Sequence, residues 1–358
     1  MAQLELKCIQ GKRILLTGHT GFKGTILSLM LKELGAEVVG LSLPPTENSL
    51  FQTLGGNITS RSIYADIRDL ENLKLVLGEI KPHGVFHLAA QPLVLPSFEL
   101  PIDTFETNFN GTLNLLEAMR SVEDLEFGVM ITTDKVYRNN ELGQDFIETD
   151  ALGGSDPYSA SKAAAEIAIE SMRKSFFQNS DCKLVAARAG NVIGGGDTAP
   201  HRLFPDLVRA FSKGVDCEIR NPESIRPWQH VFDPLYGYLL VAAAILSKHH
   251  VANAYNFGPN HANLMKVHEV AARSKEIWNS EIQINYLEQE SKVREARNLG
   301  LNSDLAKADL SWNNSLSIDQ TLTLAIEWEK FKLNNQSSES LQRFTKSQVT
   351  TYLDELSR

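Results

Sequence analysis

The sequence is poor in cysteine and has no long hydrophobic run. Its 358 residues include three cysteines, Cys8, Cys182 and Cys217, which are widely spaced and form no CxxC pair. This pattern argues against a disulfide framework and a zinc site, so we expect a reducing, cytoplasmic location and no metal. The longest apolar run, residues 235–246, is shorter than the roughly 20 residues of a membrane-spanning helix. Residues 1–10 lack the apolar core of a signal peptide, so we expect no export by that route.

Basic residues are outnumbered. The chain has 35 Lys and Arg against 44 Asp and Glu, a formal net charge of -9. Such a chain repels nucleic acid and anionic membranes as a whole, and we expect neither as a partner. Hydrophobic residues make up 42% and charged residues 22%, which is typical of globular proteins and not of disordered or fibrous ones.

Short apolar runs alternate with amphipathic stretches from residue 12 onward, a pattern typical of βαβ units and a parallel sheet. Strands are predicted at residues 13–17, 37–41, 62–65, 84–88, 127–132 and 183–188. Helices are predicted at residues 24–34, 69–80, 103–122 and 157–177. The predicted fold class is therefore α/β, a Rossmann-like doubly wound parallel sheet with a smaller carboxyl-terminal lobe.

The regular alternation ends after Gly190. We assign residues 1–190 to a dinucleotide-binding Rossmann domain and residues 191–330 mainly to a substrate-binding lobe. Within that lobe the chain is expected to return to the first domain around residues 254–257. Residues 331–358 are polar with a weak helical pattern, and we predict a helical tail packed on the surface.

Three glycines follow the first predicted strand and precede a helical pattern. Glycines spaced by three allow a tight turn and close backbone approach to a pyrophosphate at a helix amino terminus. A glycine-rich turn with no ligand is the alternative. The GxxxxGK[ST] spacing of a P-loop is absent. The dinucleotide contacts predicted in this loop are Gly18, Thr20, Gly21, Phe22, Lys23 and Gly24.

Further dinucleotide contacts are predicted at the ends of later strands. Ser42 stands where an acid often binds the adenosine ribose, which leaves NAD and NADP undecided from this position alone. Asp66 is predicted either to meet the adenine ring or to form a turn. The contacts predicted outside the glycine loop are Asp66, Ile67, Leu88, Ala89, Ala90, Gln91, Thr132, Tyr158 and Lys162.

A second motif begins at Asp156, which is predicted to cap a helix that has Pro157 in its first turn. Tyr158 and Lys162 then lie one turn apart on one helix face. An ammonium beside a phenol favours the phenolate, so we expect the pKa of Tyr158 to be lowered and Tyr158 to act as a base. Two unrelated surface side chains are the alternative for this common spacing.

The fifth predicted strand ends in Thr133, Asp134 and Lys135. This is the sheet edge at which an open α/β fold places its ligands. We expect Thr133 to hydrogen-bond the substrate, Asp134 to donate a proton and Lys135 to accept one. A solvated turn is the alternative.

Polar residues of the second lobe are candidates for an anionic substrate, because guanidinium groups suit diphosphate oxygens. Each arginine could instead be a solvated surface charge, and Arg226, inside an Arg-Pro-Trp string, is the strongest of them. The predicted substrate contacts are Gln91, Asn191, Arg202, Arg220, Arg226 and His230.

These motifs together resemble the extended short-chain dehydrogenase/reductases, and within them the NAD-dependent epimerase/dehydratase family. The resemblance spans about residues 10–330. It rests on Gly18-x-x-Gly21-x-x-Gly24, on Tyr158-x-x-x-Lys162, and on the strings at residues 17–24, 87–94, 133–135, 188–197 and 220–231.

The resemblance implies NAD as the cofactor despite Ser42, and a nucleotide-sugar substrate that loses water across C5 and C6. Related dTDP-glucose enzymes carry Glu where Lys135 stands, so the resemblance favours CDP-glucose. It further implies deoxysugar biosynthesis, such as that of lipopolysaccharide O-antigen, and a homodimer or homotetramer formed by helix pairing. Thr198 and Leu95 replace the Trp and Arg usual in this group, which bears on the substrate more than on the reaction.

Other functions stay open at this point. A dehydratase acting on another nucleotide sugar would use the same residues. A nucleotide-sugar 4-epimerase would need Tyr158 and Lys162 but has no use for Asp134 and Lys135 as an acid and base. A non-catalytic NAD-sensing protein would need only the glycine loop.

Overall fold

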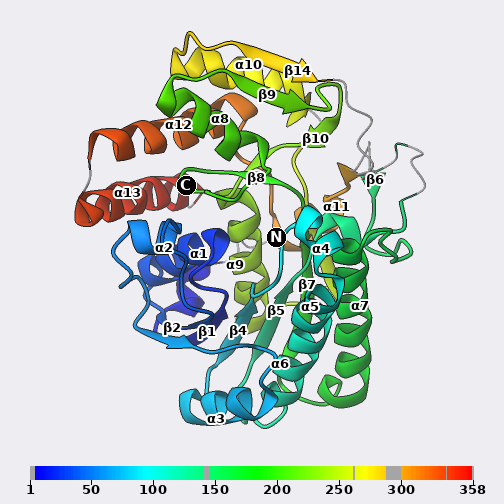
Figure 1. Ribbon diagram of the computed structural model, residues 1–358. Coiled ribbons are helices and arrows are strands. Elements are labelled where there is room, and N and C mark those ends of the chain that lie inside the picture. Colours follow the sequence, from blue (N-terminus) through cyan, green and yellow to red (C-terminus); the bar gives the residue numbers. More distant parts are fainter. Residues whose placement is uncertain are drawn as a thin grey trace.

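A seven-stranded parallel sheet forms the centre of the protein (Figure 1). The computed structural model describes residues 5–139, 143, 145–260, 263–287, 300–335 and 337–356. Parts of the two terminal segments considered above, residues 1–4, 336, 357 and 358, lie outside the described residues.

The strand order in the sheet is β12-β7-β5-β4-β1-β2-β3. The strands are β1 (Arg13–Thr17), β2 (Glu37–Ser42), β3 (Arg61–Tyr64), β4 (Gly84–His87), β5 (Phe127–Ile131), β7 (Lys183–Ala189) and β12 (Ala254–Phe257). The six predicted strands and the doubly wound topology are confirmed. The seventh strand, β12, pairs with β7 at the position where the sequence predicts that the chain returns.

Helices connect and cover these strands. They are α1 (Phe22–Glu33), α2 (Leu50–Thr53), α3 (Leu70–Ile80), α4 (Val94–Glu99), α5 (Pro101–Phe105), α6 (Gly111–Met119), α7 (Pro157–Met172), α8 (Leu203–Lys213), α9 (Phe232–Leu246), α10 (Val267–Trp278), α11 (Asp304–Leu310), α12 (Ile318–Asn334) and α13 (Ser338–Leu356). Short 3-10 segments are η1 (Leu6–Ile9) and η3 (Asp134–Val136), and π segments are η2 (Glu106–Asn110) and η4 (Arg173–Phe177).

Local sequence explains where the main helices begin. Asp69 accepts a hydrogen bond from Asn72 N at the start of α3, and Asp156 accepts one from Ser159 N at the start of α7. Pro157 lies in the first turn of α7, as its fixed φ favours. The cap at Asp156 and the position of Pro157 agree with the prediction made from the sequence.

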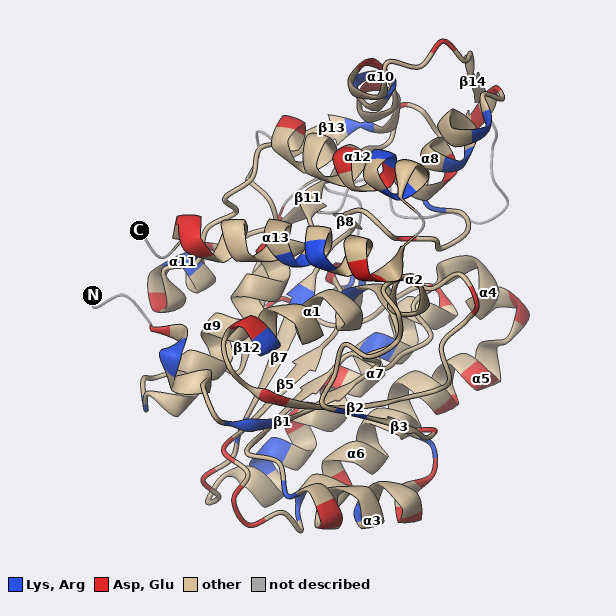
Figure 2. Ribbon diagram, turned by 90° about the vertical axis from the view of Figure 1, so that its left-hand side faces the viewer, with Lys and Arg blue, Asp and Glu red and all other residues tan. Residues whose placement is uncertain are grey.

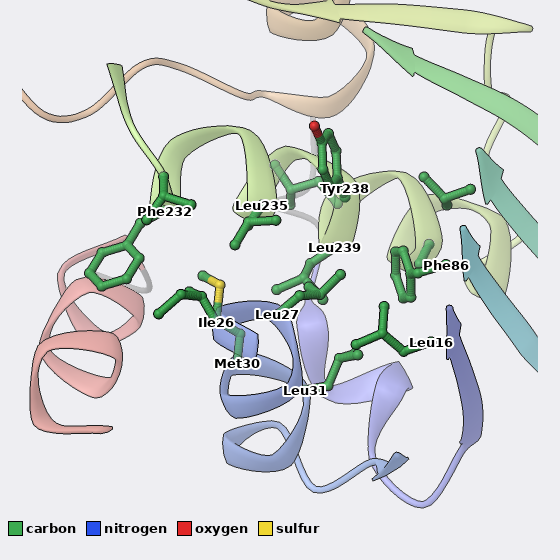
Figure 3. Close-up of a cluster of buried hydrophobic side chains, with 14 of the residues drawn as sticks. Leu16, Ile26, Leu27, Met30, Leu31, Phe86, Phe232, Leu235, Tyr238 and Leu239 are labelled. Carbon is green, nitrogen blue, oxygen red and sulfur yellow. The ribbon is translucent and has the colours of Figure 1, made fainter. Parts of the chain in front are cut away.

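Two apolar layers hold the sheet. Helices α3, α6 and α7 pack on one face, and α1 and α9 pack on the other. Figure 3 shows the second layer, in which α1 and α9 interdigitate over β1 and β4. Its labelled side chains are Leu16, Ile26, Leu27, Met30, Leu31, Phe86, Phe232, Leu235, Tyr238 and Leu239. Burial of this layer fixes α1, and therefore the glycine loop in front of it, against the sheet.

The smaller lobe has an apolar cluster of its own, separate from the two layers on the sheet. In it, α8, α10 and α12 pack around the paired strands β9 and β14. Figure 2 shows this lobe beside the carboxyl-terminal edge of the sheet, with β8 and β11 between the two parts. The short strands outside the central sheet are β6 (Asp145–Phe146), β8 (Val192–Ile193), β9 (Cys217–Arg220), β10 (Ile225–Pro227), β11 (Gln229–His230), β13 (Leu264–Lys266), β14 (Ile284–Leu287) and β15 (Gly300–Leu301). None of the described helices is long and apolar enough to cross a membrane.

The carboxyl-terminal helix α13 lies in the segment for which the sequence predicts a helical tail packed on the surface. It packs against α1 and α12, and Lys346 forms an ion pair with Glu33 of α1 at 2.8 Å. The Tyr352 hydroxyl donates to the buried carboxylate of Asp233 at 2.8 Å. The side chains of α13 that are buried are Leu341, Thr345, Val349, Tyr352 and Leu353. The sequence does not indicate which side chains of this helix are buried, because a narrow apolar stripe on a polar helix becomes core only when partner helices cover it.

We expect Tyr352→Phe to lower the free energy of unfolding by about 1.5 kcal/mol, because it removes one hydrogen bond to a buried carboxylate and almost no volume. Tyr286, which is 43% exposed, offers the control Tyr286→Phe, for which no change is expected. Urea denaturation of the two variants would measure the difference, and equal midpoints would contradict the assigned role of Tyr352.

Candidate active site

A large cavity lies where the strand order of the sheet reverses, between β1 and β4. Its volume is about 1920 Å³, larger than the roughly 300–1,000 Å³ of a site for one drug-sized ligand. The carboxyl ends of β1, β4 and β5 line one side, and the second lobe lines the other. A site at the switch point of an open α/β sheet is the expected location for a ligand. The cavity has room for a dinucleotide beside a second ligand.

Every residue that the sequence predicts for cofactor binding lines this cavity. They are Gly18, Thr20, Gly21, Phe22, Lys23, Gly24, Asp66, Ile67, Leu88, Ala89, Ala90, Gln91, Thr132, Tyr158 and Lys162. The structure thus brings these residues together, and their individual contacts with a cofactor stay predictions.

The glycine loop packs backbone against backbone. Gly18 has a φ of 74°, and a Cβ added there would lie 2.7 Å from Ala89 N at the end of β4. A Cβ at Gly24 would lie 2.1 Å from Gly18 O. Gly21 is the N-cap of α1 and lines the cavity. Because it is a glycine, no side chain separates the first turn of α1 from the cavity. This cradle fits a pyrophosphate, whose charge the exposed N–H groups of a helix start favour.

The next polar groups of the predicted cofactor site lie at the ends of β2 and β3. Thr20 Oγ1 and Ser42 Oγ lie 2.6 Å apart, so the ribose position carries paired hydroxyls where many such folds have an acid. The Asp66 carboxylate accepts hydrogen bonds from Arg68 Nε and Nη2 at 2.9 and 2.7 Å, which lowers the pKa of Asp66. This is the turn role that the sequence also allows, and both side chains line the cavity.

Strand β5 and helix α7 present the predicted catalytic groups to each other. Thr133, Asp134, Tyr158 and Lys162 are all buried, with exposed fractions of 4–8%. Lys135 is half-buried and lines the cavity. The set lies at the sheet edge that the sequence predicts.

Burial decides the proton affinities of the α7 pair. It raises the pKa of Tyr158 to about 12, an effect that hydrogen bonding with the Thr133 hydroxyl partly opposes. The sequence predicts the opposite direction, because it shows the neighbouring ammonium but not the loss of water around the phenol. Burial also lowers the pKa of Lys162 to about 8, while the carboxylate of Glu166 opposes that shift. Lys162 Nζ donates to Ile131 O at 3.0 Å and so joins α7 to β5.

Asp134, the predicted acid, is buried beside the cavity. Its Oδ1 accepts from Thr133 Oγ1 at 2.9 Å, and a Cβ added at Gly190 would lie 2.9 Å from its Oδ2. Burial raises the pKa of Asp134, against the effect of the Lys135 charge. The carboxyl lies just behind the cavity lining, and Lys135 follows it into the cavity.

The second lobe supplies most of the predicted substrate contacts. Gln91, Asn191, Arg202, Arg220 and Arg226 line the cavity. Arg202 Nη1 also forms an ion pair with Asp197 Oδ2 at 2.9 Å. The two departures from the family pattern, Thr198 and Leu95, line the cavity as well.

His230 lies elsewhere. Its side chain is 2% exposed and does not line the cavity, and its Nδ1 accepts a hydrogen bond from Phe232 N at 3.2 Å. Burial lowers the pKa of His230 to about 3, so the imidazole is neutral. The structure gives His230 a place in the packing of β11 against α9, and it does not bring the side chain to the predicted substrate site.

Several basic residues line the cavity that the sequence does not single out. They are Arg68, Arg209, Lys213 and Lys332. Their only sequence signal is a positive charge on a helix or turn, which is usually a solvated surface feature. Among the described residues no group of three or more His, Cys, Asp and Glu could hold a metal ion.

Comparison with known proteins gives concordant matches. The model of the NAD dependent epimerase/dehydratase family matches residues 14–258. A CDP-glucose 4,6-dehydratase of Salmonella typhimurium is 40% identical over 356 residues, which cover 98% of each chain. The solved structure of MoeE5 in complex with UDP-glucose and NAD is 25% identical, with a TM-score of 0.76 over 90% of this chain and 99% of that chain. A dTDP-glucose 4,6-dehydratase from Bacillus anthracis in complex with NAD is 22% identical, with a TM-score of 0.75 over 90% and 97%, and shows the same fold.

We expect Gly24→Ala to abolish NAD binding, because its methyl group cannot occupy a site 2.1 Å from Gly18 O without opening the loop. NAD bound by the purified protein, measured after denaturation and by calorimetric titration, would test this. Gly78 of α3 has no atom near its added Cβ, so Gly78→Ala should keep NAD and gain about 0.5–1 kcal/mol of stability. Retention of NAD by Gly24→Ala would remove the glycine loop from the cofactor site.

Proposed function

This chain belongs to the NAD dependent epimerase/dehydratase family, and on that premise we propose that it removes water from CDP-D-glucose to give CDP-4-keto-6-deoxy-D-glucose. It is a hydro-lyase that uses NAD without net consumption. The observation that carries the choice of reaction is the buried carboxyl of Asp134 next to Lys135, at the strand end that faces Tyr158 and Lys162. The similarity over 98% of the chain to a CDP-glucose 4,6-dehydratase supports the substrate.

The residues present fit NAD. The glycine loop would hold the pyrophosphate, Asp66 and Ile67 the adenosine end, and Thr132, Tyr158 and Lys162 the nicotinamide end. When bound there, NAD would supply a hydride acceptor for C4 of the sugar, and its reduced form would supply the hydride for C6.

The chain must first move the proton of the C4 hydroxyl. Oxidation at C4 is needed because the C5 proton of a glucose unit is not acidic until a neighbouring ketone exists. Tyr158 accepts the C4 hydroxyl proton, and Thr133 holds the substrate hydroxyl beside it. Burial disfavours the Tyr158 phenolate, so the ammonium of Lys162 on the same helix face is required to support it.

Water is then lost across C5 and C6. Lys135, in its neutral form, accepts the C5 proton, and Asp134 protonates the leaving C6 hydroxyl. The raised pKa of Asp134 suits this role because the carboxyl keeps its proton closer to neutral pH. Return of a proton from Lys135 to C5 completes the 6-deoxy-4-keto sugar.

The second lobe is proposed to bind the nucleotide diphosphate. Arg202, Arg220 and Arg226 would pair with the diphosphate oxygens, and Asn191 would reach the same group. Gln91 is fixed by its own contacts, because its Oε1 accepts from Leu93 N at 2.6 Å and its Nε2 donates to Thr104 Oγ1 at 3.0 Å.

We propose the division into residues 1–190, 191–330 with segments returning to the first domain, and 331–358. We also propose a cytoplasmic homodimer or homotetramer that acts in deoxysugar biosynthesis, such as that of lipopolysaccharide O-antigen. Exposed apolar side chains on the paired helices α5 and α7 support helix pairing, since Ile102 is 71% and Ile167 62% exposed.

Tyr158→Phe is expected to lower kcat by about 10²–10⁴-fold, because it removes the acceptor of the C4 hydroxyl proton and almost no volume. Calorimetric binding of CDP should be unchanged. Product would be measured as the absorbance of the 4-keto sugar in base after incubation with CDP-glucose. Turnover near that of the unaltered protein would mean that another group is the base.

Asp134→Asn is expected to stop the reaction after oxidation at C4, since an amide cannot protonate the leaving hydroxyl. Single-turnover mixing with CDP-glucose should show reduced-nicotinamide absorbance without the 6-deoxy product. Exchange of the C5 proton in deuterated water should persist in Asp134→Asn and be suppressed by the additional change Lys135→Ala. Unimpaired product formation by Asp134→Asn would remove Asp134 from the mechanism, and formation of CDP-galactose by the unaltered protein would indicate an epimerase.

A further inference from the structure

A buried ion pair lies directly behind the catalytic groups. Arg188 of β7 donates from Nε to Glu166 Oε1 at 2.7 Å and from Nη2 to Glu166 Oε2 at 2.5 Å. The two side chains are 5% and 4% exposed. A buried pair of this kind contributes little to stability relative to apolar residues of the same volume, because both charges lose their water. Its presence therefore calls for a reason other than stability.

The carboxylate has a third partner that belongs to the site. Thr132 Oγ1 donates to Glu166 Oε1 at 2.5 Å, and Thr132 lines the cavity immediately before Thr133 and Asp134. Glu166 thus joins the end of β5 to α7 and, through Arg188, to β7. The proposed acid and base groups lie on two of these elements, the end of β5 and α7.

The outer side of Arg188 is also fully held. Its Nη1 donates to the Tyr137 hydroxyl at 2.7 Å and to Glu148 O at 2.9 Å, and the Tyr137 hydroxyl donates to Asn256 Oδ1 at 2.7 Å. The network therefore extends to β12. Because Arg188 is held on both sides, the Glu166 side chain is fixed in one position. A constraint of this kind preserves distance between catalytic groups within the tolerance that proton transfer demands.

Glu166 lies one turn along α7 from Lys162. Lys162 Nζ donates to Ile131 O, the carbonyl next to Thr132, so the same strand end is held twice by the same helix. Electrostatic partners of Lys162 among the described residues include Glu166 on its own helix, Lys23 on α1 and His87 on β4. Tyr158, whose phenolate Lys162 is proposed to support, lies one turn before it on α7. The negative charge of Glu166 keeps Lys162 protonated to higher pH.

We propose that Glu166, fixed by Arg188, is a positioning residue that sets the end of β5 against Tyr158 and Lys162 on α7. Its carboxylate, one turn from Lys162 on the same helix, also favours the charged form of that ammonium. This inference rests on the proposed function, because it concerns the same reacting groups. It assigns a role to two residues that touch neither cofactor nor substrate.

The test compares Glu166→Gln with Glu170→Gln, a change of the same type one turn further along α7. Glu170 pairs with Arg173 and does not line the cavity. Glu166→Gln is expected to lower kcat by about 100-fold with KM nearly unchanged. The alkaline limb of its kcat profile should move to lower pH, because loss of the carboxylate lowers the pKa of Lys162. Glu170→Gln should match the unaltered protein in both respects.

Variants of Thr132 distinguish the two effects of Glu166, its link to the end of β5 and the effect of its charge on Lys162. Thr132→Val removes the link to the strand end but keeps the Glu166 charge, so kcat should fall while the alkaline limb stays in place. Thr132→Ser retains a hydroxyl and should restore most of the rate. A shift of the alkaline limb in Thr132→Val, or a normal rate in that variant, would overturn the proposal.

Glu166→Gln leaves Arg188 without its partner and could fail to fold. The double change Glu166→Leu with Arg188→Met removes both charges at similar volume and should fold, as apolar replacement of buried pairs often does. A folded double variant with the rate and pH profile of the unaltered protein would overturn the proposal. If the unaltered protein makes no product from CDP-glucose, the proposed function fails, whereas equal rates in the unaltered protein and the variants contradict only the positioning role.

Discussion

The end of β1 and the end of β4 meet with no room for a side chain between them, since a Cβ at Gly18 would lie 2.7 Å from Ala89 N. The rest of the site depends on this contact. It brings the start of α1 to the point where the strand order reverses, and it leaves the helix amino terminus open toward the cavity. The end of β5 and helix α7 bring Lys135, Tyr158 and Lys162 to the same cavity, with the buried Asp134 beside them. The predicted catalytic residues and the predicted binding residues therefore lie at the same edge of the sheet, where its strands end.

Much of this architecture follows from the sequence alone. Apolar runs with the right spacing predict the six main strands, and Asp156 followed by Pro157 predicts the start of α7 to the residue. The burial of α13 does not follow, because Leu341, Val349 and Leu353 form a stripe too narrow to be distinguished from a surface helix. These side chains are buried because α13 packs against α1 and α12. A local sequence pattern does not indicate that packing.

The same division applies to the site. Residue types and order predict which groups line the cavity, because parallel strands must end at one edge. The direction of the Tyr158 pKa shift depends on how much water the folded chain removes around the phenol, and burial raises this pKa. His230 belongs to the string at residues 220–231 that carries the family resemblance, yet its ring packs against Phe232. Side-chain direction at the end of a two-residue strand depends on tertiary contacts that a sequence does not contain.

The packing of α13 joins parts of the protein that are far apart in the sequence. Lys346 and Thr350 of α13 contact Glu33 of α1, the helix that follows the glycine loop, and Thr350 and Glu33 are 317 positions apart. Tyr352 of the same helix donates to Asp233 of α9. A fragment made of residues 1–190 would therefore lack the helix that packs on α1, although it would contain the whole glycine loop and the Tyr158 helix.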